Sequence, residues 1–269
     1  MTEQQKKEKC EEGKELFDKK QYDKAVSIFK ELADQRHDEA QFMMGICSAG
    51  GYGTEKSDAK AAQWFQKAAD QGYARAQNEL GVFYQLGAGV DRNLEKAVEL
   101  YCLAEAQGNL EAASHLAFCY QHGLGTKKDH VNAAGLYRKA AEAGHVPSQY
   151  QLGLCYHKGE GVEQNFKTAF DWYYKAAKKG DQWAQLHLGI CYYHGDGVEQ
   201  DYAKAVDVLK AAASQGLDEA QYHLGVCVLN GQGTERNLDV AVGLFQMAAK
   251  QGHVESQNAL GELKKRSII

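Results

Sequence analysis

The chain has 269 residues, of which 44% are hydrophobic and 25% charged, and its formal net charge is −5. This composition is ordinary for a folded globular protein and excludes a disordered chain, which would be poor in apolar residues. The negative charge argues against a nucleic-acid partner, because a phosphate-binding surface needs clustered Lys and Arg. A single proline leaves room for many uninterrupted helices, but the 28 glycines need a separate explanation.

The first nine residues, 1–9, are polar and contain no apolar segment of the kind that a secretory signal peptide carries. No stretch approaches the roughly 18 consecutive apolar residues that a membrane span needs. We therefore expect no membrane insertion and a cytoplasmic location.

Residues 1–36 are predicted to form a pair of helices. Apolar and small residues recur there at helical spacing, at Gly13, Phe17, Tyr22, Ala25, Phe29 and Leu32. This spacing resembles an ordinary tetratricopeptide repeat with a shorter loop, so we expect an N-terminal helical hairpin.

Residues 37–252 repeat with a period of 36 residues, which the glycines mark most clearly. A Gly-x-Gly pair recurs without insertion at 51/53, 87/89, 123/125, 159/161, 195/197 and 231/233. A second series of glycines, mostly in a Leu-Gly step, occupies 45, 81, 153, 189, 225 and 261, with Ala117 in the third copy. A third series occupies 72, 108, 144, 180, 216 and 252. A fixed period of this length is typical of a repeat array with one continuous core.

Each period predicts two helices. In the copy 73–108, apolar residues of the segment 76–84 fall on one helix face, and the Gly-x-Gly pair ends that helix because glycine adopts the left-handed conformation of helix ends. Asn93 then begins the second helix, and Gly108 ends it. The position of Asn93 holds a residue type that caps helix N-termini in every copy: Ser57, Asn93, Asp129, Asn165, Asp201 and Asn237. Gly81 and Ala97 are expected where the two helices cross, since small side chains permit close approach.

Residues 253–269 are predicted to form a lone first helix that caps the array. Glu262, Lys264 and Lys265 stand where the preceding copy has Val226, Val228 and Leu229. A polar outer face on a terminal helix is what a repeat array requires at its end.

The run from Ala184 to Val198, followed by Asp201 to Ala205, resembles the Sel1-like repeat, a 36-residue relative of the tetratricopeptide repeat. The resemblance implies an all-α fold, a right-handed α-α superhelical solenoid of antiparallel helix hairpins. It also implies one continuous domain, with a tetratricopeptide-like hairpin at 1–36, six repeats at 37–252 and a capping helix at 253–269.

The same resemblance implies binding rather than chemistry. Sel1-like proteins resemble tetratricopeptide proteins in serving as adaptors, so we expect a non-catalytic scaffold that holds a protein or peptide partner in a concave groove. An enzyme or regulatory subunit built on the repeats, or a self-assembling structural protein, remains an alternative. The oligomeric state and the partner do not follow from the repeat.

The seven cysteines have two interpretations. Five share one position of the repeat, at Cys47, Cys119, Cys155, Cys191 and Cys227, where the second copy has Phe83. Some Sel1-like proteins bridge the two helices of a repeat with a disulfide, but the second helices here lack a regular partner cysteine. We therefore predict reduced thiols that serve as small core residues, as fits the cytosol.

The sequence predicts no metal site, no cofactor and no catalytic residue. His115, His187 and His223 share one position, but helices about 10 Å apart rarely bring three ligands within about 2.1 Å of one ion. Gly123 and Gly125 resemble a phosphate-binding loop only superficially, because no strand precedes them.

The predicted partner site is the concave face of the first helices. By the geometry of tetratricopeptide-like arrays, the positions equivalent to 39, 42, 46, 49 and 50 point inward. Tyr and Trp are frequent binding anchors, although some of these side chains could instead pack between repeats. The candidate residues in copies four to six are Tyr150, His157, Lys158, Trp183, Leu186, Tyr193, His194, Tyr222, Leu229 and Asn230.

Overall fold

The computed structural model describes residues 1–266 and 268, and these residues form fifteen α-helices and no strand. The helices of residues 1–136 are α1 (Glu3–Asp18), α2 (Tyr22–Asp34), α3 (Asp38–Gly50), α4 (Asp58–Ala69), α5 (Ala74–Leu86), α6 (Leu94–Glu105) and α7 (Leu110–His122). Then come α8 (His130–Glu142), α9 (Val146–Lys158), α10 (Phe166–Ala177), α11 (Gln182–His194), α12 (Tyr202–Ser214), α13 (Asp218–Asn230), α14 (Leu238–Lys250) and α15 (Val254–Lys265).

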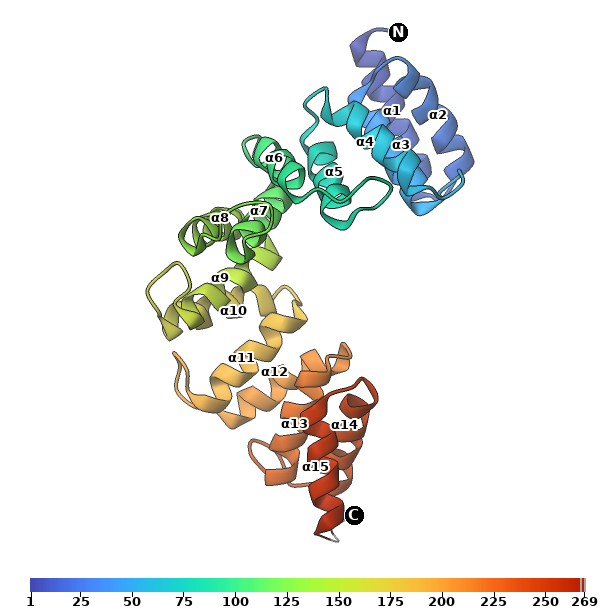
Figure 1. Ribbon diagram of the computed structural model, residues 1–269. Coiled ribbons are helices and arrows are strands. Elements are labelled where there is room, and N and C mark those ends of the chain that lie inside the picture. The colour runs from blue at the N-terminus through green and yellow to red at the C-terminus, as the bar shows by residue number, and fades with distance from the viewer. Residues whose placement is uncertain (267, 269) are drawn as a thin grey trace. The chain divides into compact units, whose positions relative to one another are not determined.

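The chain divides into two compact units, Met1–Leu136 (unit 1) and Tyr137–Ile269 (unit 2), with the boundary inside α8. In unit 1, α1 packs on α2, α3 on α4 and α5 on α6, and each pair contacts the next (Figure 1). In unit 2 the pairs are α9 with α10, α11 with α12 and α13 with α14, and α15 packs on α14. The predicted all-α fold of helix hairpins is therefore confirmed within each unit.

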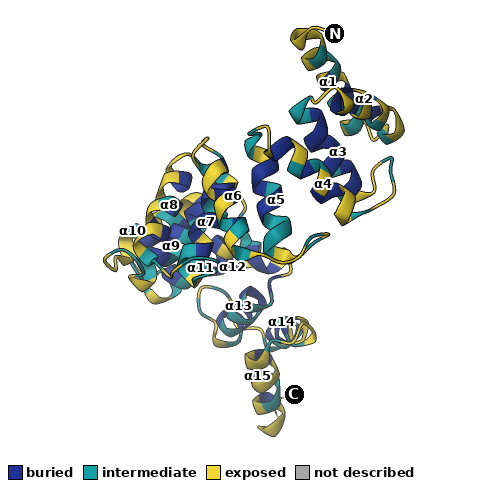
Figure 2. Cartoon of the chain, turned by 45° about the horizontal axis from the view of Figure 1, so that its top comes forward, coloured by how far each residue is buried: buried dark blue, intermediate teal, exposed yellow. Residues whose placement is uncertain are grey.

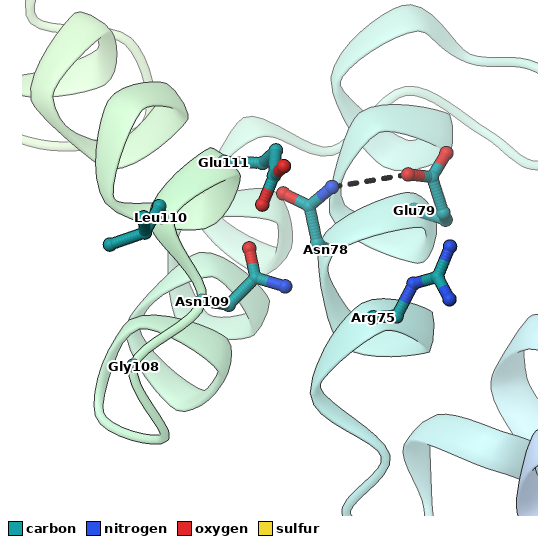
Figure 3. A pocket seen from close by; sticks show the side chains of 7 residues that line it. All are labelled: Arg75, Asn78, Glu79, Gly108, Asn109, Leu110 and Glu111. Carbon is teal, nitrogen blue, oxygen red and sulfur yellow. Dashed lines mark hydrogen bonds between the residues drawn. The ribbon is translucent and has the colours of Figure 1, made fainter. Parts of the chain in front are cut away.

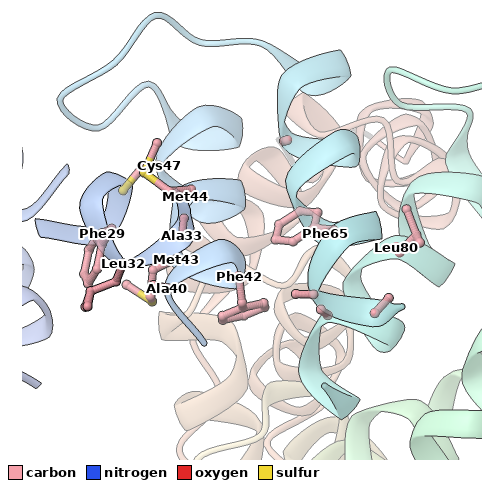
Figure 4. Close-up of a cluster of buried hydrophobic side chains, with 14 of the residues drawn as sticks. Phe29, Leu32, Ala33, Ala40, Phe42, Met43, Met44, Cys47, Phe65 and Leu80 are labelled. Carbon is pink, nitrogen blue, oxygen red and sulfur yellow. The ribbon is translucent and has the colours of Figure 1, made fainter. Parts of the chain in front are cut away.

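The core of each unit lies between successive hairpins. In unit 1, Phe29, Phe42, Phe65 and Leu80 come from four successive helices and belong to one buried cluster (Figure 4). Figure 2 shows the consequence, since α3 is buried along most of its length whereas much of α15, at the chain end, is exposed. The first helices α3, α5, α11 and α13 are each covered by a second helix on either side, and α15 packs on the one second helix that precedes it.

The helix ends follow the predicted signals. The side chains of Ser57, Asn93, Asp129, Asn165, Asp201 and Asn237 each accept a hydrogen bond from a backbone N–H in the first turn of a second helix. Each first helix from α3 to α13 ends on a glycine with positive φ, which only glycine adopts without strain. Both predictions from the sequence are confirmed.

In α3, α5, α9, α11 and α13, the glycine inside the first helix makes room for a side chain of its partner helix. A Cβ on Gly153 would lie 2.6 Å from the ring of Tyr173, and one on Gly189 would lie 2.7 Å from Cγ of Leu209. The sequence correctly predicted close approach at this position, where a glycine faces the small residue of the second helix, and the backbone oxygen of Ala205 would lie 3.5 Å from a Cβ on Gly189. Leu209 lies closer still, because the second helix also inserts a large side chain over the glycine.

The second glycine of the Gly-x-Gly pair, at positions 53, 89, 125, 197 and 233, has a role that the sequence did not reveal. A Cβ on Gly53 would lie 2.7 Å from the carbonyl oxygen of Tyr22, in the first turn of the preceding second helix. Gly197 meets the backbone of Phe166 in the same way. These loops are therefore packing elements between repeats, which explains their recurrence without any phosphate site.

The cysteines are unpaired in the structure. Cys10, Cys47, Cys119, Cys155, Cys191 and Cys227 are buried and Cys102 is exposed, so the predicted role of the shared cysteine position as a core residue is confirmed. In the described part of the chain, no helix combines the length and the apolar character that crossing a bilayer requires.

Candidate partner-binding surface

The first helices of unit 2 present equivalent residues on one face. On α11, Trp183, His187, Ile190 and His194 follow one another at intervals of four, three and four residues, so they share one side of the helix. The 36-residue spacing places matching positions on α9 and α13. We call this surface the first-helix face; it comprises Leu154, His157, Lys158, Trp183, Ile190, Tyr193, His194, Glu219, Val226, Leu229 and Asn230.

An apolar row runs through this face. Leu154, Ile190 and Val226 occupy one repeat position on α9, α11 and α13, and all three side chains are only partly buried. The sequence analysis placed this position, equivalent to 46, on the inward side of the array. None of the candidate residues proposed there occupies it. The signal was present, because every copy carries an apolar residue there, yet apolar residues at helical spacing are first interpreted as core.

Trp183 and Tyr193 stand beside the apolar row on α11. Trp183 is 41% exposed, an unusual state for so large an apolar side chain. The hydroxyl of Tyr193 donates a hydrogen bond of 2.9 Å to Oε1 of Gln232, and its ring packs edge-on against Tyr202 at 5.2 Å between centroids. Tyr193 is thus held in one orientation while part of its ring faces solvent, as suits a rigid binding anchor.

Polar residues follow at the C-terminal ends of the first helices. Lys158, His194 and Asn230 occupy one repeat position and are exposed. Beside them, His157 packs edge-on against Phe166 at 5.2 Å, and Leu229 is half-buried.

Three of the predicted residues serve mainly as packing between repeats. Tyr150 lies 5.6 Å from the ring of His187, and burial raises the pKa of Tyr150 to about 12. Tyr222 packs in the same way, 5.0 Å from the ring of His253. Leu186 at the same position is fully buried and packs between the hairpins, so it presents no exposed side chain in the predicted groove. At this position the side chain turns toward the next hairpin rather than toward solvent.

Two histidines beneath this face are held neutral by burial. Burial lowers the pKa of His187 to about 4, and the nearby His157, Lys158 and His223 act in the same direction. The ring of His187 stacks on Tyr173 at 5.3 Å with an interplanar angle of 18°. Burial also lowers the pKa of His223. These two side chains are partly buried and packed among their neighbours, and they do not supply positive charge to a ligand at neutral pH.

The N-terminal ends of the first helices form an acidic edge of the face, made of Asp181, Glu219 and Glu255. Asp181 caps α11 by accepting a 2.7 Å hydrogen bond from the N–H of Ala184. Burial raises the pKa of Glu219, and the charges of Asp218 and Glu255 raise it further. This edge favours positively charged groups on anything that binds there.

Within the described residues, no three side chains of His, Cys, Asp or Glu are placed to hold a metal ion together. What the surface offers is apolar area, fixed aromatic rings and an acidic edge at the N-terminal ends of its helices. These are the means of non-covalent recognition of an extended or helical segment.

A family model of the Sel1 repeat matches the sequence six times, at 38–73, 74–109, 110–145, 146–181, 184–217 and 218–253. Among solved structures, the chain is 33% identical to a Sel1 repeat protein from Oxalobacter formigenes, covering 89% of this chain and 96% of that one, with a TM-score of 0.82. It is 36% identical to c5321, a protective antigen of uropathogenic Escherichia coli, covering 89% of this chain, with a TM-score of 0.80.

The chain spans 51% of the length of the Escherichia coli protein. A putative Sel1 repeat protein from Klebsiella pneumoniae is 24% identical, with a TM-score of 0.51 over 76% of this chain and 99% of that one, and so shares the fold alone. No curated protein matches the sequence.

Proposed function

Because the chain belongs to the Sel1 repeat family, we propose that it is a non-catalytic scaffold that binds a segment of a partner protein on the first-helix face of unit 2. The observation that carries the proposal is the apolar row of Leu154, Ile190 and Val226 beside the exposed Trp183. An aromatic side chain that is 41% exposed beside a row of partly buried apolar residues is the kind of anchor that protein-binding surfaces present.

The geometry favours a partner segment that lies along the apolar row. Equivalent side chains of successive first helices would contact successive parts of the segment, with Trp183 and Tyr193 as anchors. The acidic edge of Asp181, Glu219 and Glu255 would face Lys or Arg residues of the partner. The same proposal places the protein in the cytosol, which the seven unpaired cysteines support.

The test compares two aromatic residues of similar exposure on different faces. Trp183 is 41% exposed on α11, and Tyr174 is 48% exposed on α10, a second helix outside the first-helix face. Partners captured by the wild-type protein are identified, and their affinities for Trp183→Ala and Tyr174→Ala are measured with purified components. We expect Trp183→Ala to weaken binding about 30-fold, corresponding to roughly 2 kcal/mol, and Tyr174→Ala to leave it unchanged.

Thermal unfolding serves as the control for both variants. Trp183→Ala should unfold within a few degrees of wild type, because the buried Leu188 and Cys191 that hold α11 remain. The opposite pattern, with capture lost in Tyr174→Ala and retained in Trp183→Ala, would place the binding surface on the second helices instead.

A further inference from the structure

Unit 1 contains a cavity of about 460 Å³ between α5 and the start of α7, lined mainly by polar side chains. Figure 3 shows Asn78 at its centre, with the carboxylates of Glu79 and Glu111 on either side and Arg75 and Asn109 below. This cavity lies outside the first-helix face of unit 2, and its interpretation does not depend on the function proposed above.

The cavity exists because of the residue at position 78. Equivalent positions hold Phe42, Tyr150, Leu186 and Tyr222, whose side chains pack against the next hairpin, and the smaller Ser114 and Asn258. Asn78 is shorter and polar, so it leaves space that an aromatic ring fills at positions 42, 150 and 222. An array that needed only to fold would gain from an apolar residue here as well, since burying an amide costs free energy unless it is fully hydrogen-bonded.

Asn78 is 4% exposed and both ends of its amide are engaged. Its Nδ2 donates a hydrogen bond of 3.2 Å to Oε1 of Glu79, and its Oδ1 lies 3.0 Å from Nδ1 of His115. The ring of His115 in turn packs on Tyr101 at 5.1 Å. This buried network fixes the Glu79 carboxylate at the cavity wall, and such preorganisation lowers the entropic cost of binding.

The charge in the cavity lacks a full counterion. Burial raises the pKa of Glu79, the hydrogen bond from Asn78 and the charge of Arg75 lower it, and the negative charge of Glu111 raises it, with burial the largest of these effects. Yet the Arg75 guanidinium lies 4.7 Å above the ring of Phe42, and in the described part of the chain it forms no ion pair with Glu79. A cation between the two carboxylates would compensate for the desolvation of Glu79.

We propose that this cavity binds a primary ammonium group, such as that of a lysine side chain, between the carboxylates of Glu79 and Glu111. An ammonium group is compact and has three N–H donors, enough to bond to both carboxylates and to one further oxygen. The fork of a guanidinium is larger and planar, so it fits the space between two separate carboxylates less well. The site is a feature of this one repeat, because only here do a glutamate at the position of Glu79 and a glutamate at the position of Glu111 in the next first helix occur together.

Two-dimensional NMR of the isotope-labelled full chain tests the proposal with defined probes. Nα-acetyl-lysine N-methylamide is titrated against its Nε-acetylated analogue, which has the same length but no positive charge. We expect saturable shifts of the amides of residues 108–111 with a dissociation constant of about 1 mM for the charged probe, and none for the acetylated one. Butylamine distinguishes a small free amine from a lysine of a peptide as the natural source of the ammonium group. If butylamine binds as tightly as the lysine derivative, the site recognises a free amine. If the lysine derivative binds more tightly, the site recognises a peptide.

Three variants locate the site. Glu79→Gln and Glu111→Gln should each weaken binding about tenfold, and Asn78→Tyr should abolish it by filling the cavity as Tyr150 does in its own repeat. Glu111 is exposed, so its variant is expected to fold even if the others do not. Glu99→Gln, on the exposed side of α6, is the matched control and should bind as wild type.

The proposal is overturned if the charged probe causes no saturable shift at residues 108–111. It is also overturned if Glu111→Gln binds as tightly as Glu99→Gln, because the shifts would then come from general attraction to an acidic protein. Retained binding in folded Asn78→Tyr would equally exclude the cavity. None of these results would affect the first-helix face of unit 2, which is tested through Trp183.

Discussion

The side-chain amide of Gln215 donates a hydrogen bond of 2.9 Å to Oε1 of Gln185, thirty residues earlier in the chain. The amide of Gln185 reaches the carbonyl oxygen of Ala177 at 3.4 Å, so the pair ties the end of α12 to α11 and to the end of α10. The same arrangement recurs for Gln41 with Gln71, Gln77 with Gln107 and Gln221 with Gln251. A paired glutamine is thus a repeated clamp between successive hairpins.

The clamp is incomplete at α9. Gln149 donates to the carbonyl oxygen of Ala141 at 3.1 Å, but its buried Oε1 has no hydrogen-bond partner. The residue that would supply the donor is Lys179, whose Nζ bonds to the carbonyl oxygen of Gly144 at 3.1 Å instead. A buried acceptor without a donor lowers stability by about 1–3 kcal/mol.

Lys179→Gln should therefore stabilise the protein. Gln215 shows that a glutamine at this position can bond both to the preceding glutamine and to the carbonyl oxygen of Gly180, so the backbone contact now made by Lys179 need not be lost. We expect a gain of about 1 kcal/mol, or about 2–4 °C in melting temperature, measured by calorimetry. Lys178→Gln changes an exposed neighbour and should have no effect; an equal gain in both variants would point to charge rather than to the clamp.

Substitution by alanine should change the stability of the protein in opposite directions at two glycines that occupy the same repeat position. A Cβ on Gly153 would lie 2.6 Å from the ring of Tyr173, whereas a Cβ on Gly261 in α15 would meet nothing within 4 Å. We expect Gly153→Ala to cost about 1–3 kcal/mol through overpacking. Gly261→Ala should stabilise the helix by up to about 1 kcal/mol, because alanine has the higher helix propensity. Urea unfolding of both variants checks this, and equal effects would refute the role of the ring.

The sequence was sufficient for features that depend on one helix or one hairpin. Asn93 and Gly87 mark helix ends through local backbone chemistry, so their positions could be predicted without tertiary structure. The burial of Leu186 could not be predicted in this way. It depends on how the next hairpin packs over this position, and the sequence does not give the orientation of one hairpin against the next. The cavity at Asn78 was missed for a related reason: it is a space left by a small side chain, not a motif.

Thiol reactivity should single out one cysteine. Burial raises the pKa of Cys47 to about 12 and that of Cys119 to about 11, so these thiols stay protonated and inaccessible. Cys102 is the exposed one, although partial burial and nearby glutamates raise its pKa too. Iodoacetamide at about pH 8.5 should therefore label Cys102 alone in the native protein and all seven cysteines in denaturant. Mass spectrometry counts the labels, and rapid native labelling of Cys47 would contradict the packing described here.

The partly buried His187 should make unit 2 less stable as the pH falls. Its folded pKa is lowered to about 4 from an ordinary value of 6.5, so the side chain is neutral in both the folded and the unfolded state at neutral pH. Between about pH 6.5 and 4 the unfolded chain takes up a proton that the folded protein excludes. The free energy of unfolding therefore decreases through this window, by about 3 kcal/mol at most, and the loss ends once folded His187 is also protonated.

The variant that isolates this effect is His187→Gln, since the equivalent position in α9 holds Gln151. Carboxylates also titrate in this pH range, so the informative quantity is the difference between wild type and variant rather than either curve alone. We expect the variant to be less stable than wild type at pH 7, because the ring stacked on Tyr173 is lost. The difference in free energy of unfolding between wild type and variant should narrow or reverse by pH 4.5. His122→Gln removes an exposed histidine on α7, and its stability should run parallel to wild type from pH 7 to 4.5. Urea unfolding at each pH gives the free energies, and a constant gap for His187→Gln would show that His187 does not resist protonation in the folded protein.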